Sequence, residues 1–240
     1  MIPFKAIRAR AAKRKGGEAV LASLLPKVPS QKGLARLKDD RVLAEMSKRI
    51  FCSGFVWRVI EQKWKGFEAA FLKFDPKRLH FQPDEFWEDL GGDKRIVRHP
   101  QKIASVRANA RFVLDIAEEH GGFGKFLAGW PADDQIGLIE LLGKRGTRLG
   151  GMTGQYFLRF IGKDVFITSR DMIACLRDAG LDISDKAASK KDLRKIQDTM
   201  NAWAQQTGLP YTHLSRICAM SVGENYDAET LRSRGGGEEE

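Results

Sequence analysis

The residues best placed to do chemistry lie in a glycine-rich segment between two predicted helices, Arg148-Leu149-Gly150-Gly151-Met152-Thr153-Gly154-Gln155-Tyr156. In a tight hairpin between two helices, the first backbone amides of the second helix have no partner within that helix. Together with the helix dipole, these amides bind phosphate oxygens well, and glycine lets another backbone approach closely. The segment therefore predicts a phosphate-binding helix-hairpin-helix. The alternative is an ordinary turn between two helices that contains glycine for conformational reasons alone.

Two sets of motifs resemble known protein families. The hairpin and the stretch that follows it, Leu158–Leu181, resemble the helix-hairpin-helix DNA glycosylase superfamily. Three further elements resemble the bacterial DNA-3-methyladenine glycosylase I family in order and spacing: "AxFxxFDP" within residues 67–76, "IxRHxxKI" at residues 96–103, and "NAR" at residues 109–111. Gly54 and Trp57 also fall where that family has Gly and Trp. The resemblance covers about residues 40–180 and implies hydrolysis of the N-glycosidic bond of alkylated purines.

Aromatic residues are the candidates for holding a damaged base. The resemblance implies a base pocket that contains Phe55 and Trp57, with Tyr156 or Trp64 as further candidates. A 3-methylated adenine in DNA is positively charged, and electron-rich ring faces attract cations. Such a base leaves the sugar in neutral form, so catalysis requires nucleotide flipping and stabilisation of a cationic sugar. The alternative is that these rings are ordinary core residues.

The acidic residues depart from the family pattern. Where the family has a glutamate in its base pocket, this chain has Arg49 or Ile50, depending on a one-residue gap. At the superfamily's aspartate position it has Ser169, with Asp171 two residues on. We expect Asp171 to be the catalytic residue, as a general base or as an electrostatic stabiliser. It could equally complement a helix dipole, and Ser169 is interpreted as a helix N-cap.

The start of the longest predicted helix carries two more candidates. The resemblance implies that His99 and Lys102 border the base pocket and contact DNA; the alternative is a surface pair at an exposed helix start. Asn109 lies in the middle of this helix, where an inward polar side chain needs a partner, so a structural bridging role is expected. The complete set of residues expected to contact DNA is Arg148, Gly150, Gly151, Met152, Thr153, Gly154, Gln155, His99 and Lys102.

No metal or cofactor is expected. The three cysteines (Cys52, Cys175 and Cys218) lie far apart and form no CxxC pair, which argues against a disulfide framework. The family's zinc-binding residues near the chain ends are not matched, because its HxxxC element falls on Asp171 and Cys175 and its N-terminal ligands have no counterpart. No apolar run approaches the ~20 residues of a membrane span. We therefore expect a cytoplasmic protein with no membrane contact.

These side chains must be positioned by helices. From about residue 39 onward the apolar residues recur at a period near 3.6, and the alternation typical of strands is missing. The longest predicted helix opens at Pro100 and ends at Gly121-Gly122. The pattern predicts an all-α fold with about ten helices, and the resemblance implies the helix-hairpin-helix DNA glycosylase fold. The expected domains are a basic N-terminal arm with a short helix (1–36), a helical glycosylase-like domain (37–228) and a flexible Gly/Glu tail (229–240).

The charge distribution points to a polyanionic partner. The formal net charge of the 240-residue chain is +10, and six of the first fifteen residues are basic while none is acidic. We interpret residues 1–16 as a mobile basic arm. A chain with this excess of positive charge suits nucleic acid as a partner. The alternative is a basic protein whose charge serves its solubility alone. The expected partner is double-stranded DNA that contains damaged bases, and a monomer is expected.

The leading functional hypothesis is a DNA glycosylase that flips and excises alkylated purines of the 3-methyladenine type and so initiates base excision repair. An alternative is a non-catalytic DNA-binding or lesion-recognition protein on the same fold. A third hypothesis is a glycosylase that acts on another base. The missing family glutamate, at Arg49 or Ile50, favours the second and third hypotheses, whereas Trp57 and the "IVRHPQKI" segment favour the first.

Overall fold

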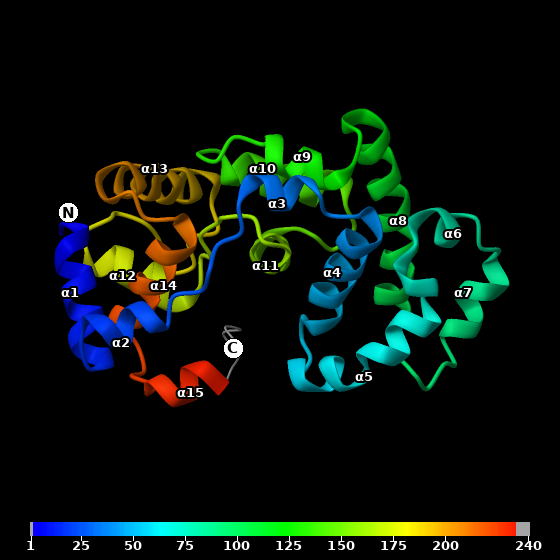
Figure 1. Ribbon diagram of the computed structural model, residues 1–240, viewed down its shortest axis with the longest axis horizontal. Helices are drawn as coiled ribbons and strands as arrows, with labels where there is room; N and C mark the ends of the chain where they lie inside the picture. Colours follow the sequence, from blue (N-terminus) through cyan, green and yellow to red (C-terminus); the bar gives the residue numbers. More distant parts are fainter. Residues whose placement is uncertain (1, 234–240) are drawn as a thin grey trace. The chain divides into compact units, whose positions relative to one another are not determined.

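Every regular element in residues 2–233, the part of the chain that the computed structural model describes, is a helix (Figure 1). The expected all-α class is confirmed for these residues. The chain divides into two compact units, one made of Met1–Val28, Ala132–Ile136 and Asp164–Glu240, and the other of Pro29–Pro131 and Gly137–Lys163. We call them the terminal unit and the central unit. None of the described helices is long and apolar enough to cross a membrane.

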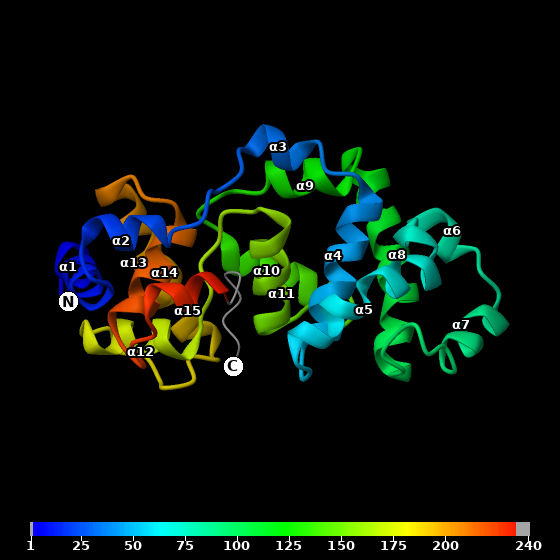
Figure 2. The ribbon, with the colours of Figure 1, turned by 60° about the horizontal axis from the view of Figure 1, so that its bottom comes forward.

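The central unit is built around the long helix α8. It contains α3 (Gln31–Ala35), α4 (Asp39–Cys52), α5 (Trp57–Ala70), η1 (Leu72–Phe74), α6 (Pro76–His80), α7 (Asp84–Leu90), α8 (Pro100–His120), α9 (Phe123–Gly129), most of α10 (Gln135–Arg145) and α11 (Gly151–Ile161). The helix α4 packs against both α8 and α11, and its core face buries Val42, Leu43 and Met46 (Figure 2). The same helix therefore contacts the long helix and the second helix of the hairpin.

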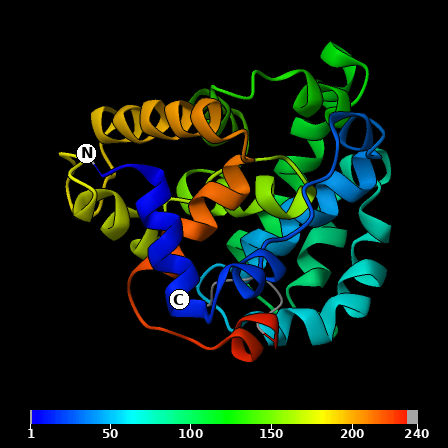
Figure 3. The same cartoon turned by 60° about the vertical axis from the view of Figure 1, so that its left-hand side comes forward.

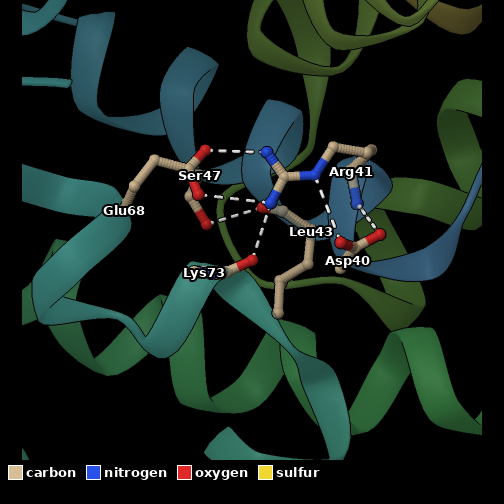
Figure 4. Close-up of polar contacts among 6 residues, drawn as sticks. All are labelled: Asp40, Arg41, Leu43, Ser47, Glu68 and Lys73. Atoms are coloured by element: carbon tan, nitrogen blue, oxygen red, sulfur yellow. Dashed lines mark hydrogen bonds and ion pairs between the residues drawn. The ribbon is translucent and has the colours of Figure 1, made fainter. Parts of the chain in front are cut away.

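The "AxFxxFDP" motif forms a left-handed turn between α5 and α6. Leu72, Lys73 and Phe74 have φ angles of 52°, 59° and 58°, a conformation that side chains other than glycine rarely adopt. Arg41 of α4 holds this turn, since its guanidinium donates to the Lys73 carbonyl at 2.7 Å and to the Glu68 carboxylate at 2.8 Å (Figure 4). The motif thus fixes the turn that connects α5 to α6.

The terminal unit contains α1 (Phe4–Lys15), α2 (Glu18–Ser23), α12 (Arg170–Asp178), α13 (Lys190–Thr207), α14 (Tyr211–Ser221) and α15 (Ala228–Ser233). Residues 1–16 were expected to form a mobile arm, and for residues 4–15 this is wrong. They form α1, which packs along α14 (Figure 3). Phe4 and Ile7 are buried, and Arg14 donates to the carbonyls of Met220 and Gly223 near the end of α14. Apolar contacts and carbonyl capping therefore order the basic segment.

The number of helices exceeds the expected ten, because six of the fifteen described α-helices have only five to seven residues. Elements this short carry too few turns for a reliable period. The proposed division into arm, glycosylase-like domain and tail stays a prediction. Within the predicted tail, Ala228–Ser233 belong to α15, while residues 234–240, which include the Gly/Glu run, lie outside the described residues.

Candidate functional site

The predicted hairpin is a tight turn between α10 and α11 in the central unit. Arg148 and Gly151 both have left-handed φ angles, 61° and 57°, which reverse the chain direction within a few residues. Gly154 lies very close to the backbone of the turn that precedes α11. A Cβ at this position would meet the Leu149 carbonyl oxygen at 2.3 Å. The glycines are therefore needed for the geometry of the turn itself. The N-cap of α11 is Gly150, which has no side chain to accept hydrogen bonds from the first amides of this helix.

Asn109 of α8 fastens this hairpin. Its side-chain oxygen accepts from the Thr147 amide at 2.8 Å, and its side-chain nitrogen donates to the Thr147 carbonyl at 3.0 Å. The Asn109 side chain thus pairs with both the N–H and the carbonyl of Thr147. This agrees with the structural bridging role expected for Asn109. Arg148 adds a further link, because its guanidinium donates to Gln101 Oε1 at 3.1 Å.

The hairpin residues expected to contact DNA differ in accessibility. Arg148, Gly150 and Gly151 are exposed, Met152 and Thr153 are half-buried, and Gly154 and Gln155 are buried. Space around Gly151 is open, since a Cβ there would meet nothing within 4 Å. The exposed part of the turn is therefore open to a phosphate, and DNA contact by these residues stays a prediction.

Two of the three predicted base-pocket rings lie together, and a buried arginine joins them. The Trp57 and Tyr156 rings meet edge to face with centroids 5.3 Å apart, and Phe160 lies 5.6 Å from Trp57. The Arg49 guanidinium lies over the Trp57 ring at 4.9 Å and over the Phe160 ring at 4.1 Å. We call these four residues the Arg49 cluster. The three rings are half-buried, whereas Arg49 is only 4% exposed.

The Arg49 side chain is incompletely paired. Its Nε lies 2.8 Å from Glu45 Oε1, one helical turn earlier, but the angle is not that of a hydrogen bond. Its Nη1 is buried and has no acceptor among the described residues. Burial raises the pKa of Glu45, and the opposing attraction of Arg49 and Lys48 is the smaller effect. Sequence reasoning missed Glu45 and Phe160, although the i, i+4 Glu/Arg pair on the apolar face of α4 was a readable signal.

Phe55 belongs to a different group of residues. Its ring lies 4.4 Å from Lys102 Nζ and 6.3 Å from the His99 ring, and it is 38% exposed. The structure therefore does not unite Phe55 with the Trp57–Tyr156 pair as one stack. Trp64, the fourth ring considered, stacks on the core rings Phe67 and Phe74.

His99 and Lys102 have clear structural roles at the start of α8. His99 is the N-cap, and its Nδ1 accepts from the Lys102 amide at 3.4 Å. Lys102 is buried, and its ammonium donates to the carbonyls of Phe51 and Ser53 at the end of α4. Burial, together with the nearby charge of Arg148, lowers the pKa of Lys102 to about 8. The alternative of an exposed surface pair is therefore wrong for Lys102, and DNA contact by either residue stays a prediction.

Asp171 lies in the terminal unit, in the first turn of α12. Ser169 is the N-cap of this helix, since its Oγ accepts from the Met172 amide at 3.3 Å, as expected from the sequence. Asp171 is half-buried, and its carboxylate lies against Gly223, where a Cβ would approach Oδ1 to 2.5 Å. Gly223 thus leaves the space that the Asp171 carboxylate occupies, because a side chain at position 223 would collide with it. Its catalytic role stays a prediction.

The Cys175 thiol of the terminal unit lies beside an arginine of α1. The Arg10 guanidinium lies 3.9 Å from Cys175 Sγ, and Ser221 Oγ donates to the same sulfur at 3.3 Å. A hydrogen bond from Cys218, then that from Ser221 and the charge of Arg10, lower the pKa of Cys175 to about 7, and the pKa of Cys218 is raised. Among the described residues, no three His, Cys, Asp or Glu side chains are grouped so that they could hold a metal ion.

Comparison with known proteins finds a family match for the segment that carries Arg49, Trp57 and α8. Residues 32–137 match the model of the methyladenine glycosylase family. The family segment holds Arg49, Trp57, His99 and Lys102, whereas the hairpin glycines and Asp171 follow it in the chain. The expected family resemblance is confirmed.

Individual relatives match over part of the chain. DNA-3-methyladenine glycosylase 1 of Escherichia coli (strain K12) is 31% identical over 75 residues, which is 31% of this chain and about two fifths (40%) of that protein. The 3-methyladenine DNA glycosylase I structure from Staphylococcus aureus gives a TM-score of 0.47 at 23% identity, covering 52% of this chain and 77% of that one. The 8-oxoguanine glycosylase/lyase of Methanocaldococcus jannaschii, solved with DNA, gives 0.45 at 16% identity, with 78% and 83% covered.

Proposed function

We propose that this chain is a DNA glycosylase that removes alkylated purines from double-stranded DNA. The observation that carries the proposal is the family match of residues 32–137, because this segment supplies the helix that bears Arg49 and the helix that fastens the hairpin. The hairpin supports the proposal independently, since it lies outside the matched segment.

The hairpin is proposed to anchor the DNA backbone. Its exposed glycines and the uncapped first turn of α11 present backbone amides and the positive end of a helix dipole to a phosphate. Such contacts position a protein on DNA without reading sequence. The net charge of +10 adds a general attraction to the phosphates.

The proposed reaction is hydrolysis of the bond between C1′ of the deoxyribose and the purine N9. The electron pair of that bond moves onto the base and water adds to C1′. The proton lost by the water goes to solvent when a positively charged purine leaves as a neutral base, and onto the base when an uncharged purine leaves. Asp171 is proposed to stabilise the positive charge that develops on the sugar or to accept the proton of the attacking water. Its half-buried carboxylate strengthens either effect relative to a fully hydrated one.

A second candidate function is a lesion-binding protein without catalysis. The observation that favours it is the guanidinium of Arg49 in the aromatic cluster, together with Ser169 acting as an N-cap where the superfamily has its aspartate. Both features remove an acid from the expected site.

Release of free base separates the two candidates. Protein in molar excess over duplexes that carry a charged or an uncharged alkylated purine should release purine and leave an abasic site that alkali cleaves, and Asp171→Asn serves as the matched control. Protein that binds an alkylated duplex more tightly than an undamaged one but releases no base from either would be the lesion binder. Sedimentation of the protein alone should give a monomer, as the sequence predicts.

A further inference from the structure

The Arg49 cluster is unusual because its aromatic faces are already occupied by a positive charge of the protein. The guanidinium lies 4.1 Å from the centroid of Phe160 and 4.9 Å from that of Trp57, close to the distance at which a ring attracts a cation. A positively charged base that reached this cluster would compete with Arg49 for the same ring faces. It would also face a like charge in a partly desolvated place, where repulsion is stronger than in water.

The unsatisfied atoms of Arg49 point to the kind of base that the cluster accepts. Its Nη1 is buried without an acceptor among the described residues, although buried donors are nearly always paired. Glu45 does not relieve this, since it meets the other side of the guanidinium, at Nε. A base with a carbonyl oxygen or an unsubstituted ring nitrogen at its edge would supply the missing acceptor.

The cluster is also connected to the hairpin that we propose binds DNA. Tyr156 and Phe160 both belong to α11, the helix whose first turn the hairpin forms, while Arg49 belongs to α4, which packs against α11. The three rings are half-buried, so the cluster reaches the surface of the central unit. A ligand edge can therefore approach the rings of the cluster from the surface.

We propose that Arg49 is a specificity-determining residue that selects uncharged purine lesions with an acceptor edge and disfavours positively charged ones such as N7-methylguanine. The inference rests on the proposed glycosylase function and narrows its substrate class. Arg49 also favours departure of a neutral base, because the electron pair of the C1′–N9 bond moves onto that base and the guanidinium stabilises the negative charge that develops. A cationic base gains nothing from this effect.

The test compares binding of two duplexes with the same surrounding sequence, one with the positively charged lesion N7-methylguanine and the other with the uncharged lesion 1,N6-ethenoadenine. Wild-type protein should bind the uncharged lesion more tightly by ~10-fold or more, the scale of one partly screened like-charge contact. Arg49→Gln, which removes the charge but keeps a polar chain, should lower this preference about tenfold. Lys48→Gln is the matched control, because it removes one charge from the adjacent position of α4, beside Trp64.

The outcomes distinguish this inference from the proposed function. An unchanged preference in Arg49→Gln, or an equal loss in Lys48→Gln, would overturn the role of Arg49. Loss of the preference without any base release from wild-type protein would support the role of Arg49 and refute the glycosylase. If Arg49→Gln melts well below wild type, Arg49→Met takes its place, since an unbranched apolar chain packs against the same rings, and the same loss of preference is expected.

Discussion

At the scale of single residues, the geometry of the hairpin depends on its glycines and on the amide side chain of Asn109. Gly154 leaves the space that the Leu149 carbonyl requires, and the Asn109 side chain makes two hydrogen bonds with the Thr147 backbone. Among the glycines of the hairpin, only Gly151 combines a left-handed φ, an exposed position and open space around it. A side chain introduced at this position would therefore contact a bound partner such as DNA and not the protein itself.

Gly151→Val should weaken binding to damaged and undamaged duplexes alike, by ~1–3 kcal/mol if one charge-assisted phosphate contact is lost. The change also strains the backbone, because φ is 57° there. Gly208→Val is the matched control: Gly208 has a φ of 68° and open space, but ends α13 in the terminal unit. Fluorescence anisotropy should show weaker binding only for Gly151→Val, and equal binding by both variants would refute the role of the hairpin.

Asp171→Asn keeps the shape of the side chain beside Gly223 and removes only the charge. If Asp171 stabilises the developing sugar cation, single-turnover base release should fall by ~100-fold or more while DNA binding is retained. If it only complements the dipole of α12, the rate should hardly change and stability should drop by ~0.3–1 kcal/mol. Asp192→Asn, in the first turn of α13, is the comparison that should change stability alone.

Because the pKa of Lys102 is lowered, we expect the free energy of unfolding to depend on pH in the alkaline range. Its pKa in the folded protein is about 8, below the 10.5 of an ordinary lysine, so the unfolded chain binds more protons between these values. The free energy of unfolding should therefore rise between about pH 8 and pH 10, by ~1–3 kcal/mol from this group. Lys102→Met should lack that rise. Urea unfolding at pH 7, 8, 9 and 10 measures it, and parallel curves for both proteins would contradict the assignment.

At the scale of helices, the sequence predicts the long elements and misses the short and strained ones. The apolar period and Pro100 predict α8 from its first residue, and Gly121 ends it with a left-handed φ as expected. The turn at Leu72–Phe74 cannot be predicted in this way, because none of its residues is glycine and its conformation is held by Arg41 from a distant part of the chain. The same reason explains why the Arg49 cluster was missed, since its members come from three helices.

The basic segment before residue 16 shows how packing changes an electrostatic prediction. In a mobile arm, every basic side chain would be available to bind DNA. In α1, however, three of them have partners within the protein: Arg8 pairs with Glu18, Arg10 with Asp178, and Arg14 with carbonyls of the terminal unit. Deleting residues 1–15 would therefore remove core residues as well as charge. Lys5 and Lys13 are the exposed basic residues of this helix.

Replacing Lys5 and Lys13 together by Gln should lower the slope of log K against log salt by at most ~2, since each phosphate contact contributes about 0.9. Binding itself should remain, because the hairpin lies in the other unit. The stability of the double variant should match wild type. A loss of all binding would show that α1 rather than the hairpin is the main anchor.

At the scale of the whole molecule, the candidate groups are divided between two units. The terminal unit holds Asp171, and the central unit holds the hairpin and the Arg49 cluster. Motif order in the sequence predicted the family of residues 32–137, and periodicity predicted the helical class. Neither could predict which side chains meet, because Arg49, Trp57 and Phe160 are brought together only by the packing of α4, α5 and α11.

The last prediction concerns the ends of the chain, where the family's zinc site would lie. In this chain Arg10, from the N-terminal helix, lies beside Cys175 and pairs with Asp178. A guanidinium next to a thiol already supplies a positive charge there and leaves fewer donors for a metal, since Zn²⁺ prefers four Cys, His or carboxylate ligands. Elemental analysis of purified protein should therefore find well under one zinc per chain, and a chelator should leave the melting temperature unchanged. Stoichiometric zinc whose removal lowers that temperature would mean that residues from the two chain ends form a metal site after all. Replacing Arg10 by Ala distinguishes the two arrangements, because it should lower stability without changing the metal content if the arginine holds the ends together.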